Sequence, residues 1–453
     1  MIQLWKYQKV PLLFIFLSIL FYLAFAYDLT RDDLPKFFSL YFGLFVSAYV
    51  IIKKSGFNFR LLVITAIIFR LLFLVATPNL SQDFYRFIWD GRMLFEGFNP
   101  YLYTPDALML NNEAPVYQAK ELYDGMGSLS AMHFTNYPPL NQLCFFLAAL
   151  FSGKSILGSV ITLRILIIAA DIGTLYFGKK LLERLKLPAT HIFWYILNPF
   201  IIIELTGNLH FEGVMVFFLV WSFYLLHKQQ WKWAAVVLAC SVSVKLIPLM
   251  FLPLFYGWFM KGQFNGSFMK KISRLVLFYS LVILSIIIIF VPFFSMEFIN
   301  NYSKTVGLWF NAFEFNASIY YIARSIGYSI TGYNEIAIIG KILPVISVLL
   351  ILAFSFIPKN NSIPKLLSSI VIAFSLYLFL STTVHPWYLT TLLALCLFTN
   401  YRYPLLWTVM ILLSYSAYTN SSNQENLWLV GIEYAAVFSA FIWEVVLKRK
   451  IKL

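Results

Sequence analysis

One acidic side chain, Asp83, stands where a long apolar stretch gives way to a polar one. A carboxylate at the boundary between lipid and water can accept the proton of a hydroxyl on a water-borne molecule, which is general base catalysis. The segment from Ser81 to Arg92 is typical of a helix. On that helix Asp83, Arg86 and Asp90 share one polar face.

The opposite face of the predicted helix is apolar. It carries Phe84, Ile88 and Phe95, which we expect to lie on the membrane surface. The same pattern has an alternative interpretation without catalysis. In that interpretation the segment is a solvated amphipathic helix that contains an internal ion pair between Arg86 and Asp90.

A second polar group, His210 and Glu212, follows another apolar stretch at a predicted external turn that begins after Glu204. These side chains can bind a substrate, a metal ion or each other. One histidine and one carboxylate two positions apart do not make a metal site by themselves. Ordinary polarity at the membrane interface is the alternative explanation.

Lys245 lies inside an apolar run, from Val242 to Leu254. A charge at that depth is costly unless it is paired or faces water. A lysine near the outer half of the bilayer can bind a lipid phosphate as a point charge. Alternatively, its side chain reaches the interface or pairs with Glu204 or Asp171.

Two further motifs open apolar runs on the predicted external side. Tyr137 precedes two prolines that suit a helix N-terminus, so plain capping explains this motif as well. His385 is followed by Pro386, Trp387 and Tyr388, where the aromatic residues also fit an interfacial belt. His385 adds a group that donates or accepts hydrogen bonds.

The elements that must position these residues are transmembrane helices. The chain has 453 residues, of which 60% are hydrophobic and 12% charged, and apolar stretches of spanning length recur along it. A spanning helix needs about 20 apolar residues, so we expect an all-α polytopic bundle with about 12–14 spans. The net charge of +14 does not indicate nucleic acid binding, because the basic residues form short clusters between apolar runs.

Orientation follows from the tendency of basic loops to stay in the cytoplasm. We place both termini and all the basic clusters there, and the acidic loop 78–137 outside. The run 138–151 is short enough for a partial or re-entrant helix, and 232–258 predicts two short helices that turn near Lys245 to Pro248. The run from Val10 to Ala26 is expected to be an uncleaved anchor. The basic clusters are Lys6 and Lys9; Lys53, Lys54 and Arg60; Lys179, Lys180, Arg184 and Lys186; Lys228 and Lys232; Lys261, Lys270, Lys271 and Arg274; Lys359 and Lys365; Arg402; and Lys448, Arg449, Lys450 and Lys452.

With this orientation, the candidate residues all fall at the outer membrane surface, and we expect one cleft to collect them. The chain has no Walker loop, no Rossmann fingerprint and no Ser-His-Asp pattern, which argues against a cytosolic nucleotide donor.

The order of these motifs resembles the GT-C superfamily of membrane glycosyltransferases. Within it, the chain is most similar to the bacterial family-87 glycosyltransferases and to the catalytic subunit of GPI mannosyltransferase I. The resemblance covers about two thirds of the chain, from residue 80 to residue 390. It rests on Asp83-Phe84-Tyr85-Arg86 with Trp89-Asp90-Gly91-Arg92, Gly97-Phe98-Asn99-Pro100-Tyr101, Tyr137-Pro138-Pro139-Leu140, Leu197-Asn198-Pro199, Gly207-Asn208 with His210 and Glu212, Lys245-Leu246-Ile247-Pro248 and His385-Pro386-Trp387-Tyr388.

The resemblance implies roles for these positions. Asp83 matches the catalytic acidic residue of the first loop, and Lys245 matches a lysine near the donor phosphate. The GPI enzyme has Asp-x-Asp where this chain has Ser81-Gln82-Asp83, so we expect no metal. The other expected substrate-binding residues are Arg86, Asp90, Arg92, Asn99, Tyr101, Tyr137, His210, Glu212, His385 and Trp387.

The resulting prediction is an inner-membrane enzyme that moves one sugar, with mannose favoured, from a polyprenyl phosphate to an acceptor hydroxyl on a glycan or lipid. Transfer would invert the anomeric centre and use no cofactor. Residues 1–453 would form one membrane domain, with a donor-binding module at 138–300 and a C-terminal module at 301–453. The alternatives are a transporter and a flippase or ligase of lipid-linked glycans, since these also need intramembrane charges.

Overall fold

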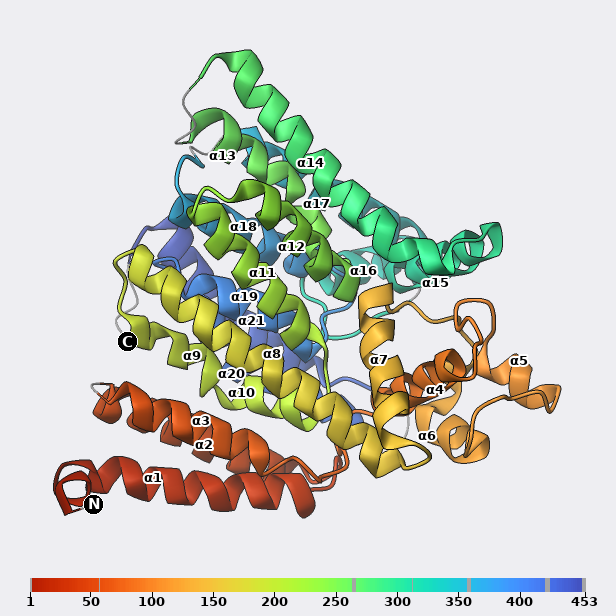
Figure 1. The fold of residues 1–453 in the computed structure, drawn as a ribbon, viewed down its shortest axis with the longest axis horizontal. Coiled ribbons are helices and arrows are strands. Elements are labelled where there is room, and N and C mark those ends of the chain that lie inside the picture. The colour runs from red at the N-terminus through yellow and green to blue at the C-terminus, as the bar shows by residue number, and fades with distance from the viewer. Residues whose placement is uncertain are drawn as a thin grey trace. The chain divides into compact units, whose positions relative to one another are not determined.

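The structure is a computed structural model that describes residues 2–56, 58–262, 266–311, 313–356, 360–419 and 424–449 (Figure 1). These residues form helices joined by loops, and their β structure is limited to one isolated bridge between Phe315 and Thr383. The predicted all-α fold is confirmed. Lys359, Lys450 and Lys452, which belong to predicted basic clusters, lie outside the described residues.

The chain divides into two compact units. The first contains Met1–Thr135, Leu140–Phe217 and Ala417–Gln424, and the second contains Asn136–Pro139, Phe218–Ser416 and Glu425–Leu453. The predicted modules 138–300 and 301–453 stay predictions.

The first unit contains the N-terminal helices and the long polar loop. Its elements are α1 (Ile2–Tyr27), α2 (Leu34–Ser55), α3 (Phe59–Leu71), α4 (Asp83–Phe95), α5 (Pro105–Leu110), α6 (Ala119–Ala131), α7 (Pro139–Ser152), α8 (Ile156–Arg184), η1 (Ala189–Ile192), α9 (Phe193–Ile196), α10 (Pro199–Ile201), the π-helix η2 (Ile202–Gly207) and the start of α11 (Glu212–His227).

The second unit contains the rest of α11 and the elements that follow it. These are α12 (Trp231–Val244), η3 (Ile247–Leu254), α13 (Phe255–Lys261), α14 (Phe268–Phe290), η4 (Val291–Phe293), α15 (Met296–Asn311), α16 (Ile319–Thr331), α17 (Ile336–Phe356), α18 (Ile363–Leu380), η5 (Pro386–Tyr388), α19 (Leu389–Cys396), α20 (Tyr403–Met410), most of η6 (Ile411–Thr419), α21 (Leu427–Phe441) and the π-helix η7 (Ile442–Val446).

Seven helices in the described part of the chain are long and apolar enough to cross a membrane, and a bent pair, Ala189–Ile196 with Pro199–Gly207, can form an eighth span. Five shorter apolar helices accompany them, so the predicted count of spans stays a prediction. The seven are Gln8–Tyr27, Leu34–Ser55, Ile156–Arg184, Phe268–Phe293, Ile336–Phe356, Ile363–Leu380 and Leu427–Val446.

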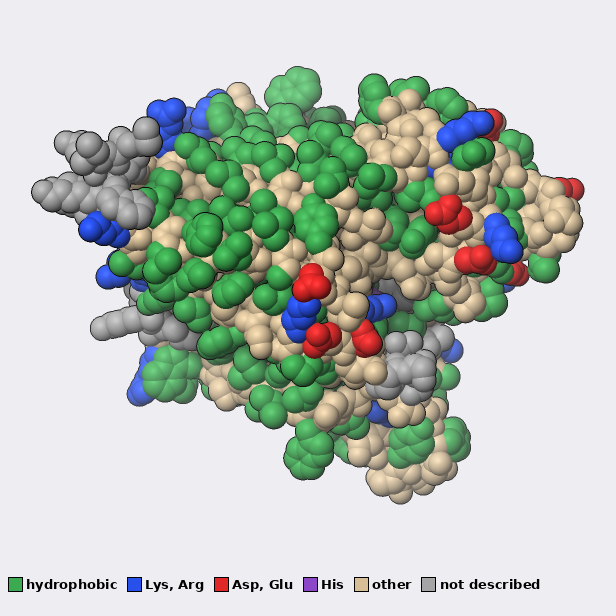
Figure 2. Space-filling view, turned by 90° about the horizontal axis from the view of Figure 1, so that it is seen from below, with side chains coloured by type: hydrophobic (Ala, Val, Ile, Leu, Met, Phe, Trp, Pro, Cys, Tyr) green, Lys and Arg blue, Asp and Glu red, His purple; other side chains and the backbone are tan. Residues whose placement is uncertain are grey.

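The outer surface of the first unit fits a lipid environment. Figure 2 views the molecule from the side on which α1 lies in Figure 1, and hydrophobic side chains cover a broad area of that face. Leu13 and Phe16 of α1 and Phe42 of α2 are among the exposed ones. Water does not favour so large an apolar surface, whereas acyl chains do.

The predicted break near Lys245 is confirmed. Helix α12 ends at Val244, Lys245 has an extended backbone, and η3 begins at Ile247. Pro248, at the second position of η3, fits a helix start. The run 138–151 is confirmed as a short helix, α7, of 14 residues.

Two buried arginines hold the bent pair in the first unit. Arg164 of α8 donates to the carbonyl oxygens of Thr206 at 2.7 Å and Gly207 at 3.1 Å, where η2 ends. Arg70 of α3 pairs with Asp171 of α8 at 2.8 Å and donates to the carbonyl oxygen of Ile196, also at 2.8 Å. These guanidinium groups bind carbonyls that have no partner inside a helix.

Helix α4 is buried on most of its sides. It packs against α6, and Phe87 stacks on Phe145 of α7 with ring centroids 4.6 Å apart. Where α4 passes α7, a Cβ atom on Gly91 would lie 2.1 Å from the carbonyl oxygen of Phe145. The expectation that Phe84 and Ile88 face the membrane is therefore wrong, since both are buried in protein.

A polar network ties loops together in the second unit. Glu425 accepts hydrogen bonds from the backbone N–H of Asn316 at 2.6 Å and from the hydroxyl of Tyr321. The side-chain amide of Asn316 donates to Glu433, and the hydroxyl of Tyr434 donates to the carbonyl oxygen of Asn316. Asn316 has a positive φ of 47°, a conformation that these bonds stabilise.

The buried ion pair gives a first prediction. In Asp171→Asn the charge of Arg70 stays buried without its counter-ion, so the free energy of unfolding should fall by about 3–5 kcal/mol. Thermal unfolding in detergent measures this loss. The control is Glu183→Gln, which breaks the exposed pair with Lys179 and should cost about 0–1 kcal/mol. Equal losses in the two variants would contradict the prediction.

Glu425 gives a pH-dependent prediction. Burial raises the pKa of its carboxyl, although the bonds from Tyr321 and Asn316 oppose this effect. A carboxyl with a raised pKa in the folded state stabilises the protein most at low pH, and this contribution is lost as the pH rises through that pKa. The Tm difference between the unchanged protein and Glu425→Gln should therefore decrease as pH rises above the usual glutamate value. Glu297→Gln, at an exposed site of the same unit, should show no such trend.

Candidate active site

Asp83 begins α4 and faces a buried histidine. Its carboxylate oxygen Oδ2 lies 4.0 Å from Nε2 of His210, and Nδ1 of the same ring lies 3.4 Å from Oε2 of Glu204. The three side chains form a row of carboxylate, imidazole and carboxylate. Two predicted residues, Asp83 and His210, are thus brought together across more than one hundred positions of sequence.

The members of this row differ in their access to solvent. The side chain of Asp83 is 37% exposed, whereas those of His210 and Glu204 are 2% and 0% exposed. An incoming hydroxyl can therefore reach Asp83, while the other two groups act on it from inside the protein. This is the arrangement that a general base with an orienting partner needs.

The turn that carries His210 is fixed from several sides. The backbone N–H of His210 donates to the carbonyl of Glu204, and that of Leu80 donates to Asn208 Oδ1 at 3.4 Å. Leu209 has a φ of 63°, which reverses the chain between η2 and α11. The bond to Asn208 joins the turn to the segment just before Asp83.

Two residues near Asp83 come from distant parts of the first unit. The guanidinium carbon of Arg31 lies 3.5 Å from the ring centroid of Tyr418. Burial raises the pKa of Tyr418 to about 12, with Arg31 opposing and the charges of Asp83 and Glu204 adding to the rise. The Tyr418 hydroxyl therefore stays protonated near these carboxylates.

The ion pair of the interpretation without catalysis is present, but it is buried and the helix is not the solvated one of that interpretation. Arg86 pairs with Asp90 at 2.8 Å and donates to the carbonyl oxygens of Ser130 and His133. Asp90 also accepts from Gln142 of α7 at 2.9 Å. These contacts give Arg86 and Asp90 a structural role in holding the loop, and their predicted part in substrate binding stays untested.

Four further predicted substrate-binding residues make contacts within the protein or are buried in it. These are Arg92, Asn99, Tyr101 and Glu212. Arg92 donates to the carbonyls of Tyr117 and Lys154, and Asn99 Oδ1 accepts from the backbone N–H of Tyr101 in a turn. The side chains of Tyr101 and Glu212 are fully buried. Binding of substrate by these four residues stays a prediction.

In the second unit, Lys245 and Tyr137 contact each other. The ammonium nitrogen of Lys245 lies 5.2 Å from the centroid of the Tyr137 ring, which is within the range of a cation–π interaction. Both side chains are half-buried. The contact brings together two predicted residues from separate motifs.

His385 and Trp387 are also paired in the second unit. Their rings stack with centroids 4.5 Å apart and an interplanar angle of 8°, and Phe315 stacks against His385 at 5.1 Å. This stack presents aromatic surface next to a histidine, and binding of substrate by His385 and Trp387 stays a prediction.

No three His, Cys, Asp or Glu side chains gather as metal ligands within the described ranges. The expectation of a metal-independent reaction remains a prediction. Three residues near Asp83 and His210 have no predicted site role, namely Glu204, Arg31 and Tyr418. Glu204 carries a signal, since it is a carboxylate inside an apolar run, whereas nothing in the sequence pairs Tyr418 with residues almost 400 positions away.

Comparison with known proteins gives a family model and a relative that both belong to the alpha-(1->6)-mannopyranosyltransferases. Residues 36–262, half of the chain, match the model of the alpha-(1->6)-mannopyranosyltransferase N-terminal domain. The matched region contains Asp83, Glu204, His210 and Lys245.

One curated relative is the alpha-(1->6)-mannopyranosyltransferase A of Corynebacterium glutamicum. It is 26% identical over 197 residues, which is 43% of this chain and 38% of that protein. The match thus spans well under half of the relative's length. With its apolar helices, the chain is an integral membrane protein. It belongs to the alpha-(1->6)-mannopyranosyltransferase family, among the family-87 glycosyltransferases of GT-C type.

Proposed function

We propose that the protein transfers one mannose residue from a polyprenyl-phosphate donor to an acceptor hydroxyl at the non-cytoplasmic face of the membrane. The observation that carries this proposal is the row of Asp83, His210 and Glu204. In this row only the carboxylate of Asp83 is open to solvent. Membership of a mannopyranosyltransferase family supports the choice of sugar.

The chemical step follows from the position of Asp83. Its carboxylate takes the proton of the acceptor hydroxyl while that oxygen forms a bond to the anomeric carbon of the donor. The bond from the anomeric carbon to the phosphate oxygen breaks, and the electron pair leaves with the polyprenyl phosphate. Attack opposite the leaving group inverts the anomeric centre.

His210 and Glu204 orient the base in this proposal. The imidazole stands between two carboxylates and lies 4.0 Å from Asp83 on its buried side, and in this proposal it limits the rotamers of the base. Lys245 is the proposed source of positive charge for the donor phosphate, and its contact with Tyr137 restricts where the ammonium group lies.

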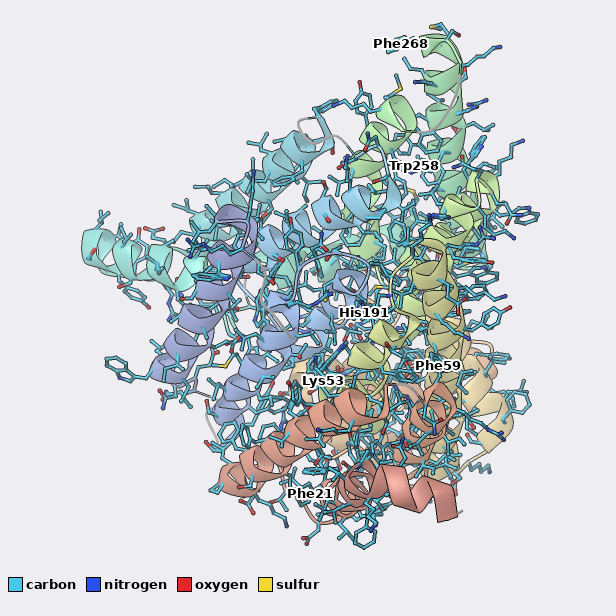
Figure 3. The ribbon with its side chains drawn as sticks, turned by 90° about the vertical axis from the view of Figure 1, so that its left-hand side faces the viewer. Phe21, Lys53, Phe59, His191, Trp258 and Phe268 are labelled. Atoms are coloured by element: carbon cyan, nitrogen blue, oxygen red, sulfur yellow. The ribbon has the colours of Figure 1, made fainter. Side chains whose placement is uncertain are left out.

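The orientation in the membrane is part of the proposal. Basic side chains lie in the last turn of α2, where Lys53 and Lys54 stand, and in the last turn of α8, where Arg184 stands. Figure 3 labels Lys53, Phe59 and His191 in this part of the first unit. Lys53 Nζ lies 6.0 Å from the ring centroid of Trp194, and Lys179 Nζ lies 4.7 Å from that of Phe59. We place this end in the cytoplasm, which puts the start of α4 and Asp83 on the opposite side.

The first test of the function is Asp83→Asn. Removal of the base should abolish transfer from polyprenyl-phosphate mannose while expression and Tm stay unchanged, because Asp83 is partly exposed and carries little packing. Purified protein is incubated with polyprenyl-phosphate mannose, glucose or arabinose and a crude lipid and glycan acceptor mixture. Glu96→Gln, an exposed change in the same loop, is the matched control. Normal turnover by Asp83→Asn would falsify the assignment of the base.

The second test concerns His210. Loss of a residue that hydrogen-bonds to a metal ligand typically costs about 10- to 100-fold in activity, and by analogy we expect His210→Gln to lower kcat by about that factor. The KM of the donor should change little. His191→Gln makes the same substitution at the basic end of the unit and should retain full activity. If the two variants behave alike, His210 has no role in orienting Asp83.

A further inference from the structure

A cavity of about 80 Å³ lies in the second unit between α17, the end of α18 and η5. Among the residues that line it, only Tyr388 belongs to one of the motifs described above. Two of the lining residues are apolar, and the other six carry hydroxyl groups. These six are Ser347, Tyr377, Ser381, Thr382, Thr383 and Tyr388.

Several of these hydroxyls already donate their protons to the protein. Ser347 donates to the carbonyl of Leu343 at 3.0 Å, and Ser381 donates to that of Tyr377 at 2.8 Å. Thr383 donates to the carbonyl of Phe313 at 2.8 Å. A hydroxyl that donates in this way offers its oxygen lone pairs to a ligand.

Three of the six lining hydroxyls, those of Ser347, Ser381 and Thr383, therefore face a ligand as acceptors, which favours ligands that donate hydrogen bonds. A phosphate dianion only accepts, and no lysine, arginine or histidine is among the described residues that line the cavity. A sugar carries several O–H groups that can donate to these oxygens. The electrostatics of the walls thus favour an uncharged polyol over the anionic part of a lipid-linked donor.

The walls are fixed before any ligand arrives. The N–H of Phe315 donates to the carbonyl of Thr382 at 3.1 Å, and the N–H of Val384 donates to that of Phe315 at 2.8 Å. Asn316, the next residue, is held in turn by Glu425. A site with preset acceptors loses less entropy when it binds.

Aromatic side chains continue from one edge of the cavity. Tyr388 lines it, and the ring of His385 meets that of Tyr388 edge-on at 5.5 Å. Trp387 stacks on His385. The C–H face of a pyranose packs well on such flat, half-buried rings. A volume of about 80 Å³ holds roughly half of a hexose, with the remainder left for this aromatic edge.

We propose that this hydroxyl-lined cavity binds one hexose residue of the donor or the acceptor. The identity of the hexose, as part of the donor or the acceptor, rests on the proposed glycosyl transfer. The proposed recognition of the hexose rests on the residues that line the cavity.

The test uses purified full-length protein and methyl α-D-mannopyranoside as the probe, with inorganic phosphate as the comparison ligand. Saturation-transfer NMR should detect the hexose and no competition by phosphate. Thr382→Val keeps the shape but removes a hydroxyl, and we expect the dissociation constant to rise about three- to tenfold, the usual value of one hydrogen bond. Ser329→Ala, at an exposed serine of the same unit, is the matched control and should bind normally.

Transfer kinetics then identify the source of the hexose. In Thr382→Val the KM should rise for whichever substrate places its sugar in the cavity, either the acceptor or the polyprenyl-phosphate mannose, while kcat changes less. Lack of hexose binding by the unchanged protein, or equal binding by Thr382→Val, overturns the inference. Hexose binding that depends on Thr382 in a protein that transfers no sugar would overturn the proposed function alone.

Discussion

The structure of the first unit depends on how carbonyl groups are satisfied where a membrane helix breaks. Between residues 189 and 207 the chain bends by 51°, and the last part of this segment is the π-helix η2. In lipid each carbonyl without a hydrogen bond there would cost several kcal/mol. This cost is comparable to the total free energy of unfolding of a small domain, which is about 5–15 kcal/mol. Arg164 and Arg70 supply the missing donors from neighbouring helices. The buried guanidinium groups therefore gain hydrogen-bond acceptors at the bend, and the carbonyls of the bend gain donors.

The position of the candidate base follows from that arrangement. The bend ends at Gly207, and the turn after it places His210 beside Asp83 and Glu204. The loop arginines on α4 complete the arrangement from the other side, because they bind the carbonyls of the loop segments that surround the helix.

Several features were predictable because they are local. The spacing of four between Arg86 and Asp90 predicted their ion pair, and Lys245 followed by Pro248 predicted the break in an apolar run. The lipid contact of Phe84 and Ile88 was predicted wrongly, since an apolar helix face looks the same whether it meets acyl chains or α7. The contacts of Glu204 with His210 and of Lys245 with Tyr137 depend on tertiary packing, which periodicity does not encode.

The close approach of α4 to α7 at Gly91 has a consequence for protein engineering. A Cβ atom at position 91 would collide with the backbone carbonyl of Phe145, so α4 can lie this close to α7 only with a glycine there. Position 91 is therefore a poor choice in a mutational library. Glu96 and Phe98, just after α4, have exposed side chains and meet no such obstacle in the described structure.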